Sequence, residues 1–330
     1  MKLQLSIGMA VNPRTRPIFD GTATADAIDL FPSPVHPSEL FWRQLRFADF
    51  DVSEMSMSSL MIAVAKGDDR WVGLPIFTTR EFFHTRILVR TDAGIDKPAD
   101  IKGKRVGVPE YQQTAALWGR GVLQHEFGVK PSDMEFWMER PPSHSHRAAV
   151  GFEPPPGVTI HQIPADKDIG TMMAAGELDA TLLYLRHDNL VDRSRVDLLN
   201  HPQVRRLFPD PIAEGTRYYR KTGIYPINHG MVIKREIAEK HPWAVLNLYK
   251  AFQKANELAD ARRREHVEYH VAAGLIPPEA GPALAKPVLQ HGMAANRATL
   301  ETAARYSHEQ GLTPRLVTVE ELFAPSTLMQ

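Results

Sequence analysis

The stretch that decides the fold is WVGLPIFTTREFFHTRILVRTDAG, residues 71–94. Two apolar runs, residues 71–77 and 85–92, have the composition of buried β-strands. Between them stand Arg80, Glu81 and His84, which interrupt the apolar sequence. These residues form either a polar surface turn or part of a cleft that holds an anionic ligand. The rest of the sequence has to separate these two interpretations.

Composition limits the function classes. The chain has 330 residues, with 43% hydrophobic and 24% charged, as expected for a globular protein large enough for two domains. The 39 Lys and Arg residues equal the 39 Asp and Glu residues, so the overall charge favours neither nucleic acid nor an anionic membrane as a partner. The absence of cysteine excludes disulfides, a thiol nucleophile and cysteine-ligated zinc.

The N-terminal segment bears on location. MKLQLSIGMAVNPRTR, residues 1–16, lacks the apolar window of a secretory signal, and the alternation of Leu3, Leu5 and Ile7 predicts a first strand. The sequence has no run of about 18 uncharged apolar residues that could span a membrane. We therefore expect a cytoplasmic protein.

Strands and helices alternate along most of the chain. The clearest example is residues 104–128, where KRVGVPE predicts a strand and YQQTAALWGRGVLQHEFG a helix that ends at Gly128. Residues 50–67 show the same order, residues 178–185 predict a further strand, and the chain beyond about residue 240 is mostly helical. This alternation predicts an α/β fold with a parallel, doubly wound sheet.

Residues 141–157, PPSHSHRAAVGFEPPPG, form a proline-rich patch in which we expect an irregular loop. His144 and His146 in this patch have no third ligand in view, so the pattern is more typical of a solvated loop than of a metal site. We predict no metal here.

In an open parallel sheet, ligands bind beyond the carboxyl ends of the strands. Six polar stretches follow predicted strands, and several of them begin helices, whose N-termini favour anions. Arginines that converge on one cleft would balance a dianion, because guanidinium groups match carboxylates bidentately. The stretches are Arg14 and Arg16; residues 54–58 with Glu54, Ser56 and Ser58; Arg80 and His84; residues 111–114 with Tyr111 and Thr114; Arg186; and residues 225–229 with Tyr225, Asn228 and His229.

Taken singly, these residues have ordinary structural explanations. An arginine at a strand end is usually solvated, Ser56 and Ser58 are suited to cap a helix, and Tyr111 is suited to packing. His84 and His229 are each more typical of structural histidines, so the hypothesis of a site depends on their joint placement. The G-x-G-x-x-G, P-loop, G-x-S-x-G and H-E-x-x-H motifs are all missing, which leaves redox cofactors and serine-type hydrolysis without support.

Four segments resemble the 4,5-dihydroxyphthalate decarboxylases, a branch of the type 2 periplasmic-binding-protein fold. They are FDVSEMSMSS (50–59), LPIFTTREFFHTRILVR (74–90), GKRVGVPEYQQTAALWGRGVL (103–123) and TGIYPINHGMVIKREIAEKHPWAVLNLYKAF (222–252). The likeness spans about residues 1–325 and is strongest in PEYQQTAALWGRG and GIYPINH.

The resemblance implies two α/β lobes that close on a ligand in a central cleft. Residues 1–90 would begin lobe I, residues 91–226 would form lobe II, and residues 227–330 would return to lobe I with the C-terminal helices. The chain would cross at residues 78–90 and again near residue 225. The interrupted strands of the opening stretch would then be a hinge whose polar residues face the cleft.

The resemblance also implies a reaction, the cofactor-independent decarboxylation of 4,5-dihydroxyphthalate to protocatechuate and carbon dioxide in aromatic degradation. A hydroxyl para to the leaving carboxylate supplies electrons, so the site needs a general acid, a base, cations for the other carboxylate and the exclusion of water. We predict His229 or His84 as the proton donor and Glu54 as the base. The predicted carboxylate and hydroxyl contacts are Arg14, Arg16, Arg80, Arg186, Ser56, Ser58, Tyr111, Thr114, Tyr225 and Asn228.

Two alternatives stay open at this point. One is a non-enzymatic solute-binding protein for an aromatic carboxylate in ABC-type uptake, against which the missing signal sequence counts. The other is an enzyme of the same fold that acts on a different molecule. For the predicted decarboxylase, the expected partner is a small aromatic dicarboxylate substrate. Assembly into a homo-oligomer is left open.

Overall fold

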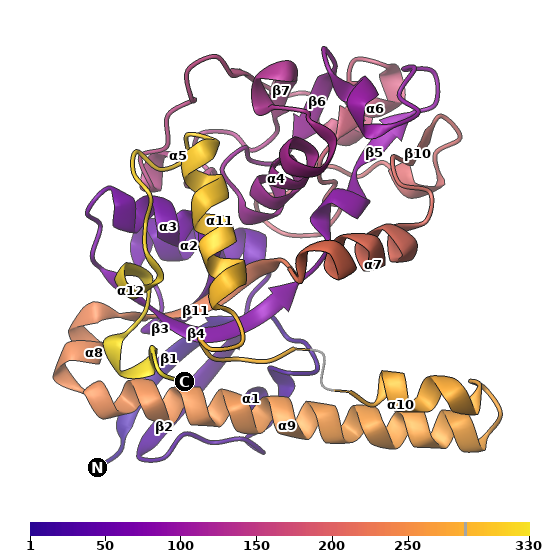
Figure 1. The fold of residues 1–330 in the computed structure, drawn as a ribbon. Helices are drawn as coiled ribbons and strands as arrows, with labels where there is room; N and C mark the ends of the chain where they lie inside the picture. Colours follow the sequence, from indigo (N-terminus) through magenta and orange to yellow (C-terminus); the bar gives the residue numbers. More distant parts are fainter. Residues whose placement is uncertain (287–288) are drawn as a thin grey trace.

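The computed structural model describes residues 1–286 and 289–330, which form two mixed β-sheets flanked by helices (Figure 1). The first sheet has the order β2-β1-β3-β11-β4. Its strands are β1 (Leu3–Met9), β2 (Ile28–Pro34), β3 (Val52–Ser56), β4 (Trp71–Arg80) and β11 (Ile227–Lys234). The second sheet has the order β10-β5-β9-β6-β7-β8. Its strands are β5 (Leu88–Arg90), β6 (Arg105–Val108), β7 (Glu135–Met138), β8 (Thr159–Gln162), β9 (Ala180–Thr181) and β10 (Val204–Arg206).

Helices cover both sheets, and the predicted α/β class is confirmed. They are α1 (Arg16–Phe19), α2 (Pro37–Phe47), α3 (Met57–Ala65), α4 (Thr114–Phe127), α5 (His146–Ala149), α6 (Ile169–Ala175), α7 (Pro211–Thr222), α8 (Arg235–Lys240), α9 (Pro242–Ala272), α10 (Gly281–Leu284), α11 (Arg297–Glu309) and α12 (Val319–Leu322). Helix α7 was not expected, and the strand predicted over residues 178–185 is reduced to Ala180–Thr181. None of the helices in the described residues is long and apolar enough to cross a membrane.

One strand in each sheet runs against the others. Strand β11 is antiparallel to β3 and β4, and β5 is antiparallel to β9 and β10, whereas β1–β2, β1–β3, β6–β7, β6–β9 and β7–β8 are parallel. Strands β5 and β11 are the first strands after the chain crosses between the sheets. A chain that crosses at the cleft enters the new sheet at the edge where its parallel strands end, and so it runs in the opposite direction. The predicted parallel arrangement therefore fails at β5 and β11 and holds for the other strand pairs.

The two crossing segments lie side by side. The 3₁₀ helix η1 (Phe83–Arg86) leads from β4 into β5, and the Glu81 N–H donates to the carbonyl of Pro226, just before β11, over 3.3 Å. The Trp118 indole of α4 donates to the carbonyl of Ile227 over 2.8 Å, which ties the second sheet's helix to the returning strand. The lobe boundaries near residues 90 and 226 stay a prediction.

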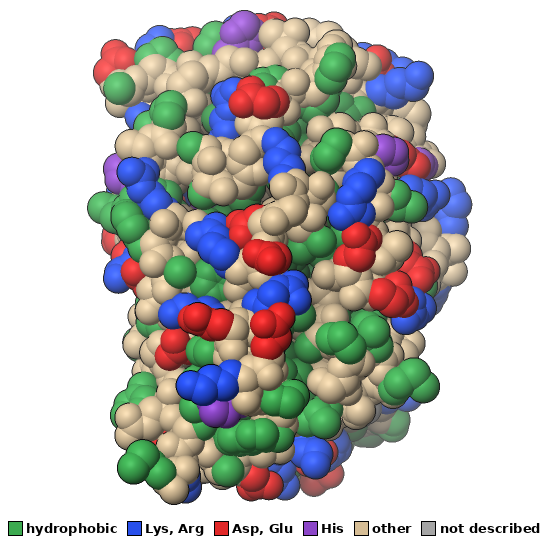
Figure 2. Space-filling model, turned by 90° about the vertical axis from the view of Figure 1, so that its left-hand side faces the viewer, with side chains coloured by type: hydrophobic (Ala, Val, Ile, Leu, Met, Phe, Trp, Pro, Cys, Tyr) green, Lys and Arg blue, Asp and Glu red, His purple; other side chains and the backbone are tan. Residues whose placement is uncertain are grey.

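The C-terminal helices contact both halves of the molecule (Figure 1). Helix α9 buries Val245, Leu248 and Phe252 in the apolar core of the first sheet. Helix α11 lies against α4, where Tyr306 contacts Trp118 edge-on at 5.6 Å between ring centroids. Figure 2 shows one face of the surface, on which acidic and basic side chains are interspersed, as the balanced composition predicts.

Candidate active site

A cavity of about 170 Å³ lies between the two sheets, next to the crossing segments. A cavity of about 150 Å³ can hold benzene, so this one suits a single aromatic ring. Its walls are His36, Pro37, Ser38, Phe41, Ser56, Thr79, Glu81, Phe83, Arg86, Gln113, Thr114, Ala115, Arg140, His146, Leu183, Leu185, Asn228 and His229.

Three helices begin at this cavity. Pro37 and Ser38 open α2, Ser56 directly precedes α3, and Thr114 is the first residue of α4. The hydroxyls of Ser56 and Thr114 lie 2.8 Å apart and join the two halves of the molecule. Free backbone N–H groups and aligned peptide dipoles at helix N-termini favour an anion, so the cavity has positive ends without a surface cluster of lysines.

His229 reaches the cavity from β11 with a buried carboxylate behind it. Glu54 on β3 accepts a hydrogen bond from His229 Nδ1 over 2.8 Å, from Thr78 Oγ1 over 2.6 Å and from the Ala10 N–H over 2.9 Å. Burial alone would raise the pKa of Glu54, but the hydrogen bond from His229, the charge of that ring and the other donors together lower it. The ionised carboxylate therefore holds the hydrogen on Nδ1 and leaves Nε2 for chemistry.

Asn228 contacts the other nitrogen of the same ring. Its amide nitrogen lies 2.8 Å from His229 Nε2, which makes Nε2 an acceptor and the ring neutral in this arrangement. A rotation of the amide by 180° would present Oδ1 instead and match a protonated ring. Asn228 can thus accompany both protonation states of His229.

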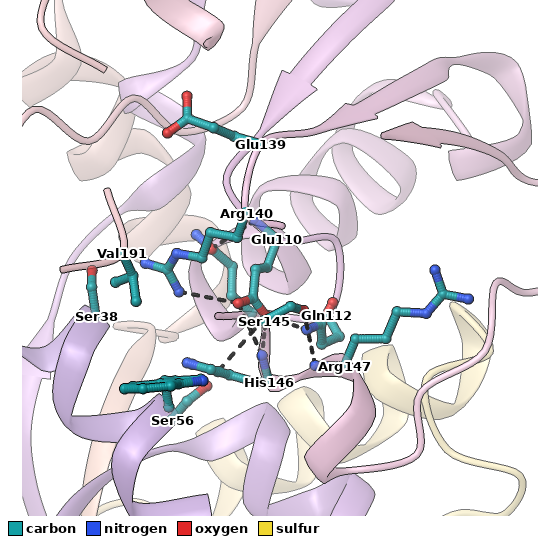
Figure 3. A network of polar contacts seen from close by, with 12 residues as sticks. Ser38, Ser56, Glu110, Gln112, Glu139, Arg140, Ser145, His146, Arg147 and Val191 are labelled. Carbon is teal, nitrogen blue, oxygen red and sulfur yellow. Dashed lines mark hydrogen bonds and ion pairs between the residues drawn. The ribbon is translucent and has the colours of Figure 1, made fainter. Parts of the chain in front are cut away.

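A second buried histidine faces the cavity from the second sheet. His146 at the start of α5 is 1% exposed, and neither of its ring nitrogens has a hydrogen-bond partner in the described structure. Its Nδ1 lies 3.8 Å from the carboxylate of Glu110, which accepts the His146 backbone N–H over 3.1 Å (Figure 3). Burial lowers the pKa of His146, so its ring is neutral at neutral pH.

Arg140 crosses the floor of this region. It pairs with Glu110 over 3.3 Å and with Asp192 over 2.9 Å, and its Nε hydrogen has no partner among the described residues (Figure 3). Burial opposes the charge, but the two carboxylates outweigh it and raise the pKa of Arg140. Two carboxylates against one guanidinium leave one net negative charge beside His146, which would stabilise a proton on that ring.

Apolar side chains complete the walls. Phe41 on α2 contacts His229 edge-on at 4.7 Å between ring centroids and His146 at 6.0 Å. Phe83, Leu183 and Leu185 face the cavity as well. These apolar faces suit an aromatic ring.

The structure brings some of the predicted site residues together. Ser56, Thr114, Asn228 and His229 line the cavity. Glu54 and Ser58 lie behind the cavity wall. Glu54 accepts the hydrogen bond from His229, and the Ser58 N–H donates to the Thr114 hydroxyl over 2.9 Å. Glu54 therefore cannot reach a ring hydroxyl directly, because His229 stands between it and the cavity.

The other predicted residues lie elsewhere. His84 is fully buried and pairs with Glu214 over 3.1 Å, because the turn of η1 directs its neighbour Phe83 to the cavity instead. Tyr111 packs under Arg120, whose guanidinium carbon is 3.7 Å from the ring centroid. Arg186 pairs with Asp197 at the surface over 3.4 Å.

Arg14, Arg16, Arg80 and Tyr225 form a third group, which lines grooves beside the cavity. Tyr225 stacks on Phe82 at 4.8 Å between ring centroids. None of the four is part of the cavity wall, so the predicted clamp of arginines is not assembled there.

Sequence reasoning missed Arg140, His146, His36 and Arg86. His146 lies in the proline-rich segment for which a solvated loop was predicted, and this prediction is wrong, because the segment folds into α5 and buries the ring. Ser145 was the available signal, because a serine before His146 and Arg147 can cap a helix, and its hydroxyl accepts the Arg147 N–H over 3.0 Å. The described residues contain no group of three or more His, Asp or Glu side chains placed to hold a metal ion.

The class of fold is that of the periplasmic binding proteins. The alkanesulfonate-binding protein SsuA from Xanthomonas axonopodis pv. citri, bound to MOPS, superimposes with a TM-score of 0.54 at 16% identity, covering 98% of each chain. The desulfurization enzyme DSZB gives a TM-score of 0.55 at 16% identity, covering 99% of this chain and 98% of that one. Residues 41–151 match the family described as ABC transporter, phosphonate, periplasmic substrate-binding protein.

The particular family follows from sequence. The chain is 34% identical over 330 residues to the 4,5-dihydroxyphthalate decarboxylase of Comamonas testosteroni, covering 99% of this chain and 98% of that protein. The chain belongs to the 4,5-dihydroxyphthalate decarboxylase family.

Proposed function

We propose that this protein decarboxylates 4,5-dihydroxyphthalate to protocatechuate and carbon dioxide. The observation that carries the proposal is the Glu54–His229 pair, whose histidine lines a cavity the size of one ring. Family membership supports the same reaction. The walls supply what the chemistry needs: an acid, a base, positive ends for carboxylates and apolar faces for the ring.

Binding uses the three helix N-termini. The carboxylate that stays on the product would accept hydrogen bonds from the N-terminal region of α4, including Gln113 and Thr114, with the free Nε hydrogen of Arg140 as a further donor. The ring would lie between Phe41 and Phe83. This pose directs the reactive edge of the ring toward His229.

The electrons come from the hydroxyl para to the leaving carboxylate. In the proposed step His146 takes the proton of this hydroxyl, and the freed electron pair moves through the ring to the carbon that bears the carboxylate. Protonated His229 gives its Nε2 proton to that carbon, and the C–C bond then breaks to release carbon dioxide and restore aromaticity. His146 returns its proton to the oxygen, so the sum is one carboxylate and one proton converted to one C–H bond and carbon dioxide.

The two histidines come from different sheets, which gives the hinge a role. His229 belongs to the first sheet and His146 follows a strand of the second, so only the closed arrangement places acid and base on opposite sides of one ring. Closure also removes water from the carboxylate that leaves, which favours its loss as neutral carbon dioxide.

Three further statements belong to the proposal. The cytoplasmic location, the assembly into a homo-oligomer and the lobe boundaries at residues 90 and 226 remain predictions. Cell fractionation, light scattering and limited proteolysis would check them in turn.

Incubation of the purified protein with 4,5-dihydroxyphthalate tests the reaction. We expect protocatechuate and carbon dioxide in equal amounts, measured by chromatography and by gas release. Tight binding by calorimetry without product would favour a solute-binding protein instead. No binding at all would indicate an enzyme for a different molecule.

A further inference from the structure

A groove rich in arginine lies next to the active site, on another part of the first sheet. It has a volume of about 730 Å³, and we call it the arginine groove. It lies between the loop that follows β1, the end of β4 and the middle of α9. Its walls are Asn12, Pro13, Arg14, Arg16, Thr78, Thr79, Arg80, Ala259, Asp260, Arg262, Arg263, His266 and Leu289.

Few of the groove's arginines form ion pairs among the described residues, although Asp20 and Glu54 act on some of them from farther away. Five arginines face one carboxylate, Asp260, and Arg263 already holds that carboxylate at 2.9 Å. Arg16 and Arg262 form no ion pair within the described parts of the chain. Arg16 and Arg262 are exposed to solvent, so the case for an outside anion rests mainly on the two inner arginines, Arg14 and Arg80.

The two inner arginines, Arg14 and Arg80, also lack a carboxylate partner. Arg14 donates to the backbone carbonyls of Phe77, over 2.8 Å, and Thr78, while Arg80 donates to the carbonyl of Gln290 over 3.1 Å and to Asn296. Neither guanidinium reaches a carboxylate, and the buried Nε of Arg80 has no partner among the described residues. Burial and the nearby charge of Arg14 lower the pKa of Arg80 to about 10.

The walls indicate which anion fits. Pro13, Ala259 and Leu289 give the groove apolar faces between the arginines, which suit the carbon skeleton of an organic ligand. Guanidinium groups on several sides match a ligand with two planar carboxylates better than a compact inorganic anion. The groove is also larger than the cavity in which the reaction would occur.

The groove and the active site share structure. Thr79 lines both, and the Thr78 hydroxyl that holds Glu54 at 2.6 Å belongs to the residue whose carbonyl Arg14 holds. A ligand that draws on Arg14 would therefore act on the segment that supports the Glu54–His229 pair.

We infer that the arginine groove is a second binding site for organic dicarboxylates, separate from the reaction cavity and adjacent to it. This goes beyond the proposed function and does not depend on it, because binding in the groove requires no turnover.

Calorimetric titration with phthalate tests the inference. Phthalate carries two carboxylates and has no ring hydroxyl to drive decarboxylation, so it reports binding alone. We expect two phthalate sites per wild-type chain. In the double variant Arg16→Gln and Arg262→Gln, we expect one site to weaken about 10-fold or more, since each charged contact contributes about one order of magnitude in affinity.

Arg264→Gln is the matched control, because Arg264 is an exposed arginine of the same helix that does not line the groove. It should leave both phthalate sites as they are. The absence of any phthalate site, or phthalate binding that the double variant leaves unchanged, would overturn the inference. Displacement of phthalate by inorganic phosphate at equal concentration would overturn the assignment to dicarboxylates. Failure of the decarboxylation assay would leave these titrations interpretable.

Discussion

Two of the buried histidine–glutamate pairs, His229–Glu54 and His84–Glu214, stand in different regions of this protein, and of these two only the first opens on the cavity. His229 pairs with Glu54 over 2.8 Å on the wall of the cavity, and His84 pairs with Glu214 over 3.1 Å inside the core. His84 is enclosed by Phe82, Phe208 and Tyr218. The pairs are chemically alike, so the difference lies in what the free nitrogen can reach.

The comparison shows what makes a buried pair useful for chemistry. The Nε2 of His229 contacts Asn228 and lies beside a space for a ligand, whereas the Nδ1 of His84 is buried with no partner among the described residues. A base and its orienting carboxylate are therefore not enough. A reacting atom must also have room beside them.

The largest effect is expected from substitutions that break the His229–Glu54 pair. His229→Gln should lower kcat for 4,5-dihydroxyphthalate about 1000-fold, because the amide can fill the space but cannot transfer a proton. Stopped assays of protocatechuate formation would measure it, with circular dichroism to confirm folding. Glu54→Gln should lower kcat less, since the ring keeps its place but loses the charge that favours its protonated form. Wild-type rates in His229→Gln would remove this histidine from the mechanism.

The next largest effect is expected at His146, whose ring, unlike that of His229, forms no hydrogen bond to a carboxylate. His146→Gln should lower kcat about 100-fold through loss of the base for the ring hydroxyl. The loss should shrink as pH rises, because the hydroxyl then ionises without help. A pH profile of kcat between neutral and alkaline conditions measures this.

His144→Gln is the matched control for His146→Gln, because His144 lies in the same segment but does not line the cavity, and its ring contacts Trp42 in a tilted arrangement at 5.1 Å between centroids. It should keep wild-type activity at every pH. Equal losses in both variants would mean that the segment matters for folding and that His146 is not the base.

The smallest effect on turnover is expected at the second pair, which should act on stability. Burial alone would raise the pKa of Glu214, but hydrogen bonds from Arg217 and His84 outweigh it and lower the pKa to about 2 from a usual 4.5. A depressed folded-state pKa stabilises the protein above the unfolded value, and this stabilisation is lost as pH falls from about 4.5 to about 2. We expect a contribution of about 2 kcal/mol at neutral pH, after allowance for the exposure of Arg217.

Urea unfolding of wild type and Glu214→Gln at pH 7 and pH 3 measures this contribution. The variant should be less stable at pH 7, the gap should narrow at pH 3, and kcat should stay within about threefold of wild type. His84→Gln should behave alike. A large loss of kcat in either variant would place the second pair in the reaction after all.

Much of the fold was predictable, because it depends on neighbours in sequence. The helix that starts near Thr114 ends just before Gly128, as predicted, since Gly128 adopts a left-handed φ of 67° that a side chain disfavours. The candidate site was only partly predictable. Ser56, Thr114, Asn228 and His229 follow from strand ends, but nothing local shows that Phe83 faces the cavity while His84 turns into the core.

The sequence by itself determined the alternation of strands and helices, the family and the polar stretches at strand ends, because each depends on short-range periodicity or on matching motifs. Only the tertiary structure decided that Arg140 and His146 face the cavity while Arg14 and Arg80 face a different groove. Side-chain direction at a crossing between two sheets depends on residues far away in the chain, such as Glu214 for His84 and Glu54 for His229. The space beside each histidine then decides whether the pair can react with a ligand or only stabilises the fold.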